Sequence, residues 1–347
     1  LGDHGGTQSN GEFHAMSVRS SGRQPWLSVL MPVFNGEEYL ATALDSIVAQ
    51  SDDEIEVIAV NGDSTDNTLS ILRSYQETLA ILILQRERTS NWVMKTNQAL
   101  SQARGDYVCF LHHDDCWLEG RLKIMKQLAR QFPDVSILLH PTYYLDQNGK
   151  RLGMWKCPLP PSPQIVQPEL MMERLLVQNF ISIVAPVFKR ETALQAGGMN
   201  EGLWYTADWD FWLNLASRST ILYFPRPLSG FRIHPTSQTI SQSAQERDFR
   251  GQLDFVTEKY FGLWDAPAPF KKKVRKVTEF SNQVNTALAQ TVHGRSNQLA
   301  SLLKAFLLLG PSGWHRYLRD SRILERVSAR VKVGLTPAKA AEDKQPS

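Results

Sequence analysis

The sequence of 347 residues has few cysteines, no long apolar run and little net charge. Its three cysteines, Cys109, Cys116 and Cys157, form no CxxC pair. So sparse and odd a count argues against a disulfide scaffold and a structural zinc site, and is typical of a reducing compartment. The longest strongly apolar stretch, residues 305–309, is far shorter than the roughly 20 residues that span a bilayer. The composition therefore predicts a globular chain without a transmembrane helix.

The net charge of +3 conceals a division along the chain. Residues 1–269 carry 23 basic and 30 acidic groups, a net charge of −7, whereas residues 270–347 carry 15 basic and 5 acidic groups, a net charge of +10. Two regions of opposite field do not make a neutral protein. We expect a disordered leader over residues 1–25, which are rich in glycine and serine, and a disordered tail over residues 336–347.

Several nucleotide and hydrolase signatures are also missing. No GxGxxG follows a predicted strand, and no GxxxxGK[ST] occurs, which argues against a dinucleotide-binding dehydrogenase and a P-loop enzyme. Neither HExxH nor GxSxG is present. A ligand would therefore be held by carboxylates and a metal rather than by a glycine-rich cradle.

The first half of the sequence alternates apolar, β-prone runs with segments of helical periodicity. This pattern predicts an α/β fold with a mostly parallel sheet flanked by helices. The predicted strands cover residues 27–34, 55–60, 81–84, 107–111 and 135–140. Polar clusters follow three of these strands at Asn35, Asn61–Asp63 and His112–Asp115. Since ligands of such sheets bind at the carboxyl ends of the strands, these clusters predict a binding site.

The second half is predicted to be more helical. A segment with five prolines, residues 156–168, predicts a rigid extended connection. It is followed by predicted strands at 182–188, 221–224 and 228–233 and by a helix at 208–217. Residues 243–262 and the chain after residue 270 have a helical pattern, and they predict a C-terminal helical extension.

Four segments, taken in order, carry a resemblance to one family. They are Ser28-Val-Leu-Met-Pro-Val-Phe-Asn35, Val60-Asn-Gly-Asp-Ser-Thr-Asp-Asn-Thr68, Phe110-Leu-His-His-Asp-Asp-Cys-Trp117, and Gly197-Gly-Met-Asn-Glu201 with Ala207-Asp-Trp-Asp-Phe-Trp212. Together they resemble the family 2 glycosyltransferases, whose sheet has the GT-A fold. The resemblance covers residues 27–240, and implies a transferase domain over residues 26–240 and a separate helical region over 241–335.

The third segment resembles the family's D-x-D metal site. The resemblance implies that Asp114, with Asp115 beside it, binds a divalent cation on the donor diphosphate, and oxygen ligands suit Mg²⁺ or Mn²⁺. The sequence departs from the pattern at His112, which stands where an aspartate is usual and suits Mn²⁺ better than Mg²⁺. A late histidine, His234, is expected to complete the site. The competing interpretations are that the aspartates cap the next helix and that His234 is structural.

The resemblance also implies nucleotide contacts. Asp63 or Asn61 is expected to receive a hydrogen bond from the base, although both are ordinary turn residues. Arg86 is expected near the nucleotide or a phosphate. The full set of expected nucleotide contacts is Pro32, Phe34, Asn35, Asn61, Asp63, Arg86 and Asp114.

Asp208 is the expected general base. An inverting transfer needs one carboxylate to take the proton of the acceptor hydroxyl as that oxygen attacks the anomeric carbon. The family places this base just before an aromatic-Asp-aromatic helix start, and Ala207 stands where a glutamate is common. A helix cap is the competing role of Asp208. We expect Trp204, Trp209 and Asp210 on the acceptor side, where aromatic rings can stack on a sugar.

The resemblance implies an inverting glycosyltransferase that uses UDP-sugar or a related nucleotide-diphospho-sugar. The expected acceptor is a hydroxyl of a glycan, a lipid-linked sugar or a glycoprotein, as in polysaccharide and cell-envelope biosynthesis. Substitutions at His112, Asp63 and Ala207 motivate an alternative, a non-catalytic relative that binds nucleotide or glycan. Donor binding without turnover would distinguish it.

The basic tail predicts a docking function. Leu299, Leu303 and Leu307 belong to one helical stripe, and five arginines follow between residues 316 and 330. We expect peripheral contact with an anionic membrane, at the cytoplasmic face of the plasma membrane, and no nucleic acid because no recognition module is present. The competing interpretation is a helical appendage packed on the catalytic domain.

Overall fold

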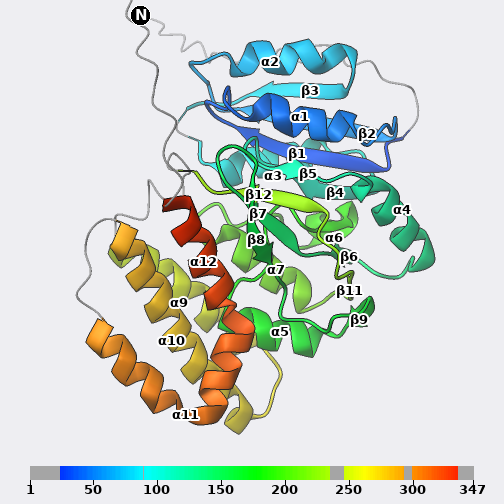
Figure 1. Cartoon of the computed structure of the whole chain (residues 1–347). Helices are drawn as coiled ribbons and strands as arrows, with labels where there is room; N and C mark the ends of the chain where they lie inside the picture. The colour runs from blue at the N-terminus through cyan, green and yellow to red at the C-terminus, as the bar shows by residue number, and fades with distance from the viewer. Residues whose placement is uncertain (1–23, 89, 235–245, 293–298, 335–347) are drawn as a thin grey trace, which may run out of the picture.

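The computed structural model describes residues 24–88, 90–234, 246–292 and 299–334. The expected leader, apart from residues 24 and 25, and the expected tail 336–347 lie outside these ranges. Within them, an α/β body holds two sheets, and the helices that follow residue 245 gather below the larger sheet in the view of Figure 1. This agrees with the predicted α/β class and C-terminal helical extension.

The larger sheet has eight strands in the order β3-β2-β1-β4-β10-β6-β11-β9. The first four are parallel neighbours. Of these, β1, β2 and β4 are buried on both faces, which explains the continuous apolar runs of the sequence, whereas the edge strand β3 is half-buried on one face. The strand bounds are β1 Leu27–Val33, β2 Ile55–Asn61, β3 Ala80–Gln85, β4 Tyr107–Phe110, β6 Ile137–Leu139, β9 Gln164–Val166, β10 Val187–Lys189 and β11 Ile221–Tyr223.

Two strands of this sheet, β10 and β9, differ from the predictions. The strand predicted at 182–188 is reduced to β10, which runs antiparallel to both β4 and β6. Before it, the amide of Ala185 donates to the carbonyl of Ser182 in a turn, and Pro186 has no N–H to offer a neighbouring strand. The proline-rich connection contains β9, an antiparallel edge strand beside β11.

Of the second sheet, the sequence patterns predicted only the strand at 228–233, which corresponds to β12, and missed the other three strands. Its four strands have the order β5-β12-β7-β8 and the bounds β5 Cys116–Trp117, β12 Ser229–Arg232, β7 Thr142–Leu145 and β8 Arg151–Trp155. Strands of two to five residues are too short to show a period of two clearly. This sheet matters because β5 begins immediately after Asp115 and β12 ends just before His234.

The helices cover both faces of the larger sheet. Asn91 caps α3 at its start, where its side chain accepts a 2.8 Å hydrogen bond from the amide of Met94. The helix α11 is broken at Gly310, whose φ is 71°, just before Pro311. The bounds are α1 Leu40–Val48, α2 Thr68–Ser74, α3 Trp92–Gln102, α4 Arg121–Gln131, α5 Pro168–Val177, α6 Arg190–Gln195, α7 Ala207–Ala216, α9 Glu246–Leu263, α10 Ala268–Val292, α11 Leu299–Ser321 and α12 Ile323–Gly334; a short 3₁₀ turn, η1, covers Tyr75–Glu77.

The C-terminal helices share a core with the α/β body. Phe249, Tyr260 and Phe280 belong to the same buried cluster as Phe110 of β4 and Trp212 of α7. Buried hydrogen bonds join the two parts as well, including one from the Thr278 hydroxyl to the Leu176 carbonyl at 2.9 Å. The helical extension is therefore packed on the body, and its last helix reaches the cavity described below. No helix of the described ranges is long and apolar enough to cross a membrane.

Candidate functional site

A cavity of about 910 Å³ opens where the carboxyl ends of β1 and β4 meet the smaller sheet and the C-terminal helices. Asn35 follows β1, His112 and Asp114 follow β4, Asp208 lies in the first turn of α7, and Arg326 belongs to α12. Four separate parts of the chain thus place polar side chains around one volume. The predicted position at the ends of parallel strands agrees with this geometry.

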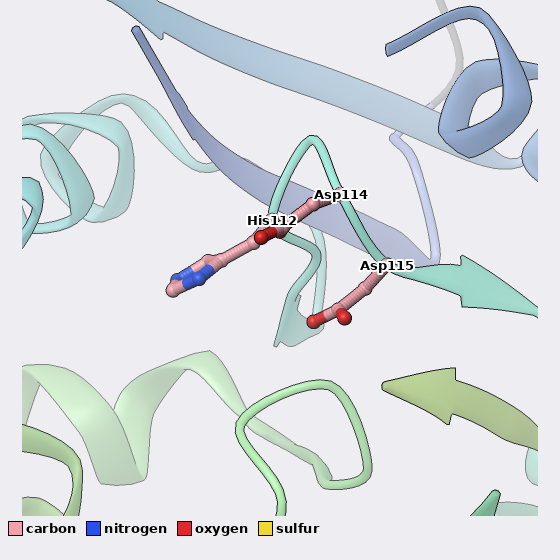
Figure 2. A group of neighbouring side chains, drawn as sticks. All are labelled: His112, Asp114 and Asp115. Atoms are coloured by element: carbon pink, nitrogen blue, oxygen red, sulfur yellow. The ribbon is translucent and has the colours of Figure 1, made fainter. Parts of the chain in front are cut away.

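The loop His112–Asp115 joins the two sheets. Figure 2 shows its three labelled side chains leaving one turn, with His112 and Asp115 pointing in different directions. One potential ligand atom from each of His112, Asp114 and Asp115 lies within 4.8 Å of the others. The loop is anchored from the second sheet, because the backbone amide of Arg232 donates to Asp115 at 2.9 Å and its Nε donates to the Asp114 carbonyl at 2.8 Å.

The carboxylate of Asp114 is charged and points to a histidine. Its Oδ2 lies 3.0 Å from Nε2 of His234, which reaches it from the end of β12. Burial alone would raise the pKa of Asp114, but the hydrogen bond from His234 and the neighbouring imidazoles hold it well below its usual range. An ionised carboxylate is the ligand that a divalent cation requires, whether or not that cation is also bound to phosphate.

Asp115 is buried behind Asp114. Burial and the charge of Asp114 raise the pKa of Asp115 well above its usual value. Its Oδ1 accepts the hydrogen bond from Arg232, whereas its Oδ2 has no partner among the described residues. An unpaired buried carboxylate oxygen is costly unless a cation or donor meets it. The carboxylate oxygens of Asp114 and Asp115 are therefore suitable ligands for a hard divalent cation.

His112 offers a neutral nitrogen to the same volume. Burial lowers its pKa to about 4, so the imidazole is uncharged near pH 7. Its Nε2 is buried and has no partner among the described residues, and its ring contacts the edge of Trp92 at 5.3 Å between centroids. A neutral imidazole can coordinate a transition metal such as Mn²⁺, as the sequence interpretation anticipated.

Besides Asp114, three expected nucleotide contacts lie in the cavity wall. Pro32, Phe34 and Asn35 line it together, and Asn35 has a positive φ of 47°. The Asn35 side chain holds the next loop in place by accepting a 2.9 Å hydrogen bond from the amide of Thr65. Lys95 approaches the Phe34 ring to 5.5 Å from its centroid. The floor at the end of β1 is thus built by contacts from two other segments.

The other expected nucleotide contacts lie outside the cavity wall. The amide of Asn61 is occupied, since it donates to Gln85 at 3.0 Å and its oxygen accepts from the Ser64 hydroxyl at 2.6 Å. Asp63 is exposed, with a φ of 58°. Arg86 turns toward α3 and donates to the Ser90 hydroxyl at 2.9 Å. The structure therefore does not bring these three side chains together with Asp114 around the cavity.

Asp208 lies at the start of α7 and faces the cavity. Its Oδ1 accepts a 2.8 Å hydrogen bond from the amide of Trp209, and its Oδ2 accepts one of 2.8 Å from Nδ2 of Asn179. Burial raises the pKa of Asp208 to about 6, against the opposing effect of these two hydrogen bonds. The helix cap residue is Thr206, so capping does not account for Asp208. A carboxylate with a pKa near 6 can accept a proton near neutral pH.

The three residues expected on the acceptor side have different surroundings. Trp204 lines the cavity, and its indole N–H donates to Asp248 at 2.6 Å. Trp209 touches the cavity but is only 2% exposed. Asp210 is buried outside the cavity wall and forms a 2.7 Å ion pair with Lys259 of α9. Its carboxylate thus fastens α9 to α7.

Several cavity residues escaped the sequence interpretation. Lys95 is 3% exposed and donates to the Val33 carbonyl at 3.3 Å, and burial lowers its pKa to about 8. Asn179 positions Asp208, and Arg326 and Arg330 reach the cavity from α12. Lys95 lies within α3, where no motif in the local sequence marks it. Arg326 and Arg330 lie in a long helical stretch that also contains no motif. Only the folded chain brings them to Asp208.

The basic tail is largely engaged with the protein. Arg316 pairs with Glu173 of α5, and Arg319 pairs with Asp320 at 2.6 Å. Arg275 pairs with Glu258 of α9. The leucine stripe is divided, because Leu302 and Phe306 pack against the core whereas Leu299, Leu303 and Leu307 are exposed.

Comparison with known proteins agrees with this arrangement. Residues 28–191 match the sequence model described as glycosyl transferase family 2. An uncharacterised glycosyltransferase of Rickettsia typhi is 25% identical over 255 residues, which are 73% of each chain. An uncharacterised glycosyltransferase of Haemophilus influenzae is 24% identical over 67% of this chain and 76% of its own.

Solved structures show the same fold. The structure of residues 1–349 of S. aureus TarS in complex with UDP-GlcNAc has a TM-score of 0.63 and 18% identity, over 88% of this chain and 89% of that one. The mannosyltransferase PcManGT of Pyrobaculum calidifontis, in complex with GDP-Man and Mn²⁺, has a TM-score of 0.52 and 20% identity, over 93% and 89%. The family match, the relatives and the fold converge: residues 28–191 belong to glycosyl transferase family 2, and the chain has the GT-A fold of these glycosyltransferases.

Proposed function

We propose that this transferase moves a sugar from a nucleotide-diphospho-sugar to an acceptor hydroxyl with inversion, and that Asp208 is the general base. The observation that carries the proposal is that Asp208 and Asp114 face one cavity from different elements, α7 and the loop after β4. The structural relatives support the donor class, since TarS was solved with UDP-GlcNAc and PcManGT with GDP-Man.

The chemistry follows from the two carboxylates. The acceptor oxygen attacks the anomeric carbon, the bond from that carbon to the phosphate oxygen breaks, and Asp208 takes the hydroxyl proton. Asn179 holds Oδ2 and the Trp209 amide holds Oδ1, each at 2.8 Å, and a carboxylate oxygen with one such donor keeps a lone pair for the acceptor proton. Burial has raised the pKa of Asp208 to about 6, which increases its basicity while it stays ionised near pH 7.

The leaving nucleotide diphosphate needs positive charge. Asp114 would hold a divalent cation there, with His112, Asp115 and His234 around it, and a bound cation supplies charge neutralisation for the departing phosphates. Oxygen ligands suit either Mg²⁺ or Mn²⁺, and a neutral imidazole among them favours Mn²⁺. Arg232 keeps the loop in position through its hydrogen bonds to Asp115 and to the Asp114 carbonyl.

The direct test is nucleotide release from a panel of UDP- and GDP-sugars with Mn²⁺ and candidate acceptors. Asp208→Asn preserves the shape and removes the base, so turnover should fall by about 10²- to 10⁴-fold while donor affinity is retained. Asp134→Asn, a change of the same kind on an exposed turn, is the matched control. Unchanged turnover in Asp208→Asn would refute the assignment of the base.

A second candidate function is a non-catalytic relative that binds nucleotide or glycan. One observation favours it: His112, a neutral imidazole, stands where the family usually has the first aspartate of its metal site. Calorimetry with the same donor panel separates the two candidates. Donor binding without transfer or hydrolysis would support the non-catalytic relative.

We also propose that the transferase binds its acceptor, a glycan, lipid-linked sugar or glycoprotein, at the surface of an anionic membrane. Leu299, Leu303 and Leu307 recur at every fourth residue of α11 and are 78%, 61% and 58% exposed, so they form one apolar face. Exposed Lys304 on the same helix, and Lys272 on α10, supply positive charge that anionic lipids attract.

Vesicle sedimentation tests this surface. The protein should bind phosphatidylglycerol vesicles at low salt more strongly than phosphatidylcholine vesicles, and Leu303→Ser with Leu307→Ser should abolish the difference. Leu194→Ser, on an exposed apolar residue of α6, is the control. Failure to bind anionic vesicles at low salt would refute membrane contact and leave the transferase proposal intact.

A further inference from the structure

Two arginines of the last helix enter the cavity without a carboxylate partner. Arg326 and Arg330 both line it, and their spacing of four residues puts them on one face of α12. Arg326 is only 9% exposed, whereas Arg330 is exposed. Neither forms an ion pair with any residue in the described part of the chain. Neighbouring arginines of the tail do pair, as Arg316 does with Glu173 and Arg319 with Asp320.

The Arg326 guanidinium is held by a neutral hydrogen-bond network. Its Nη2 donates to Asn285 Oδ1 at 2.9 Å, and Asn285 Nδ2 in turn donates to Gln178 Oε1 at 2.9 Å. The Ser281 hydroxyl donates to the same Gln178 oxygen at 3.0 Å. A buried cation oriented only by amides keeps its charge uncompensated, which is costly unless an anion joins it.

The surroundings of the pair resemble a subsite for a sugar-containing ligand. Tyr144 and Trp155 line the same cavity and stack at 5.2 Å between ring centroids, with an interplanar angle of 15°. Both arginines interact electrostatically with Tyr144 and with Tyr205. Tyr205 also interacts with Asp208, so the arginines belong to the part of the cavity that contains the base.

Two like charges on one helix face repel each other. Although the Arg330 side chain is partly open to solvent, desolvation at the cavity wall and the positive charge of Arg326 lower its pKa. An oxyanion between them would relieve this repulsion and accept paired N–H donors from the planar guanidinium groups, a geometry that suits both phosphate and carboxylate. The acidic residues on the cavity wall belong to other elements than α12, and in the described part of the chain none of them forms an ion pair with Arg326 or Arg330; they are Glu37, Glu38, Asp66, Asp114 and Asp208.

We propose that Arg326 and Arg330 form a binding subsite for an oxyanion carried by the acceptor, so that this transferase acts on phosphate- or carboxylate-bearing glycans. The inference rests on the proposed function, since it specifies the acceptor class of the same cavity. Arg326 forms the buried wall of the subsite, and Arg330 is at its exposed side. Tyr144 and Trp155 provide the adjacent surface for a sugar or polyol.

The experiment uses matched charged and neutral probes on the full chain. Calorimetry compares glycerol 3-phosphate with glycerol, and glucuronate with glucose, with UDP and Mn²⁺ present throughout. Wild type should bind at least one charged probe about 10-fold or more tightly than its neutral twin, because two charge-assisted contacts are lost in the twin. The phosphate and carboxylate arms identify which oxyanion is preferred, and inorganic phosphate should compete with it.

Variants then assign the preference to α12. Arg330→Gln should reduce affinity for the charged probe by about 10-fold or more and leave the affinity for UDP unchanged. Arg330→Lys should recover part of the affinity. Lys272→Gln removes one positive charge from an exposed site on α10 and should change neither. Arg326→Gln is interpreted only with an unchanged thermal midpoint, because that side chain is buried.

The outcomes that would overturn the inference are distinct from failure of the proposed function. Equal affinity of wild type for charged and neutral probes, or the same preference in Arg330→Gln, would refute the subsite. An equal loss of UDP affinity in Arg330→Gln would assign the arginines to the donor diphosphate instead. Failure of the proposed function would appear separately, as absence of donor binding or turnover in wild type.

Discussion

The hydrogen bond from Asn179 to Asp208 offers a sharp test of the catalytic proposal. It is 2.8 Å long and meets the carboxylate oxygen that the Trp209 amide does not contact. Because it stabilises the ionised form, its loss should raise the pKa of Asp208 above its present value of about 6. The perturbation is Asn179→Ala, which leaves Asp208 itself in place.

The magnitude follows from the charge on the acceptor. A hydrogen bond to a charged group contributes about 1.5–3 kcal/mol, and one pKa unit corresponds to about 1.4 kcal/mol. The pKa of Asp208 should therefore rise by about 1 to 2 in Asn179→Ala. Below its pKa the protonated base cannot accept the hydroxyl proton, so kcat/KM should fall about tenfold for each pH unit.

The assay measures kcat/KM for the acceptor from pH 5 to 9, with the donor at saturating concentration. Wild type should lose activity below about pH 6, and Asn179→Ala below about pH 7 to 8, with a similar plateau at high pH. Asn148→Ala, at an exposed turn, should retain the wild-type profile. An acid limb that stays near pH 6 in Asn179→Ala would refute the coupling, and a wild-type limb near pH 4 would refute the raised pKa.

The same pKa makes a separate prediction for stability. Asp208 has a folded-state pKa of about 6 against an ordinary value of 3.8, so folded protein holds this proton more tightly than unfolded protein does. The ionised group then reduces stability by up to about 3 kcal/mol above pH 6, and this cost disappears as the pH falls below 4. Asp208→Asn should accordingly be more stable than wild type in urea at pH 8 and equally stable at pH 4.

The remaining predictions concern the cation, the α7–α9 contact and a tight turn. Asp114→Asn should abolish the dependence of donor affinity on Mn²⁺, measured by calorimetry with and without EDTA, because the charged ligand is lost. Lys259→Met leaves buried Asp210 without its 2.7 Å partner and should lower the free energy of unfolding in urea by about 1–3 kcal/mol, an effect absent when Asp210→Asn is added. Gly105→Ala should cost about 1–3 kcal/mol in the same assay, because its Cβ would lie 2.7 Å from the backbone nitrogen of Ser28; an unchanged midpoint would contradict this contact.

Much of the catalytic half follows from local sequence. The runs that form β1, β2 and β4 are mostly apolar and are buried over their whole length, because both faces of a parallel sheet are covered. The end of such a strand is a fixed place in the fold, so the segments after it can be located without coordinates. Asn35, His112 and Asp114 were expected at a binding site on this basis and line the cavity, whereas Asp208, which also lines it, was expected there from the family resemblance.

Tertiary structure alone decided the rest of the site. Asn61, Asp63 and Arg86 also follow strands, yet local hydrogen bonds or turn geometry direct them away from the cavity. Strands as short as β5 carry no readable period, so only β12 of the sheet that anchors Asp115 was predicted.

The basic tail shows the same division between sequence and structure. The sequence by itself determined that the last 78 residues carry a net charge of +10 and form amphipathic helices. It did not determine which groups these charges meet. Nothing in the sequence distinguishes Arg316, which pairs with Glu173, from Arg326, which lines the cavity. Packing of the C-terminal helices makes that distinction, because burial and the nearest partner decide what a charge can bind: Arg316 meets Glu173 of α5, whereas Arg326 meets Asn285 of α10.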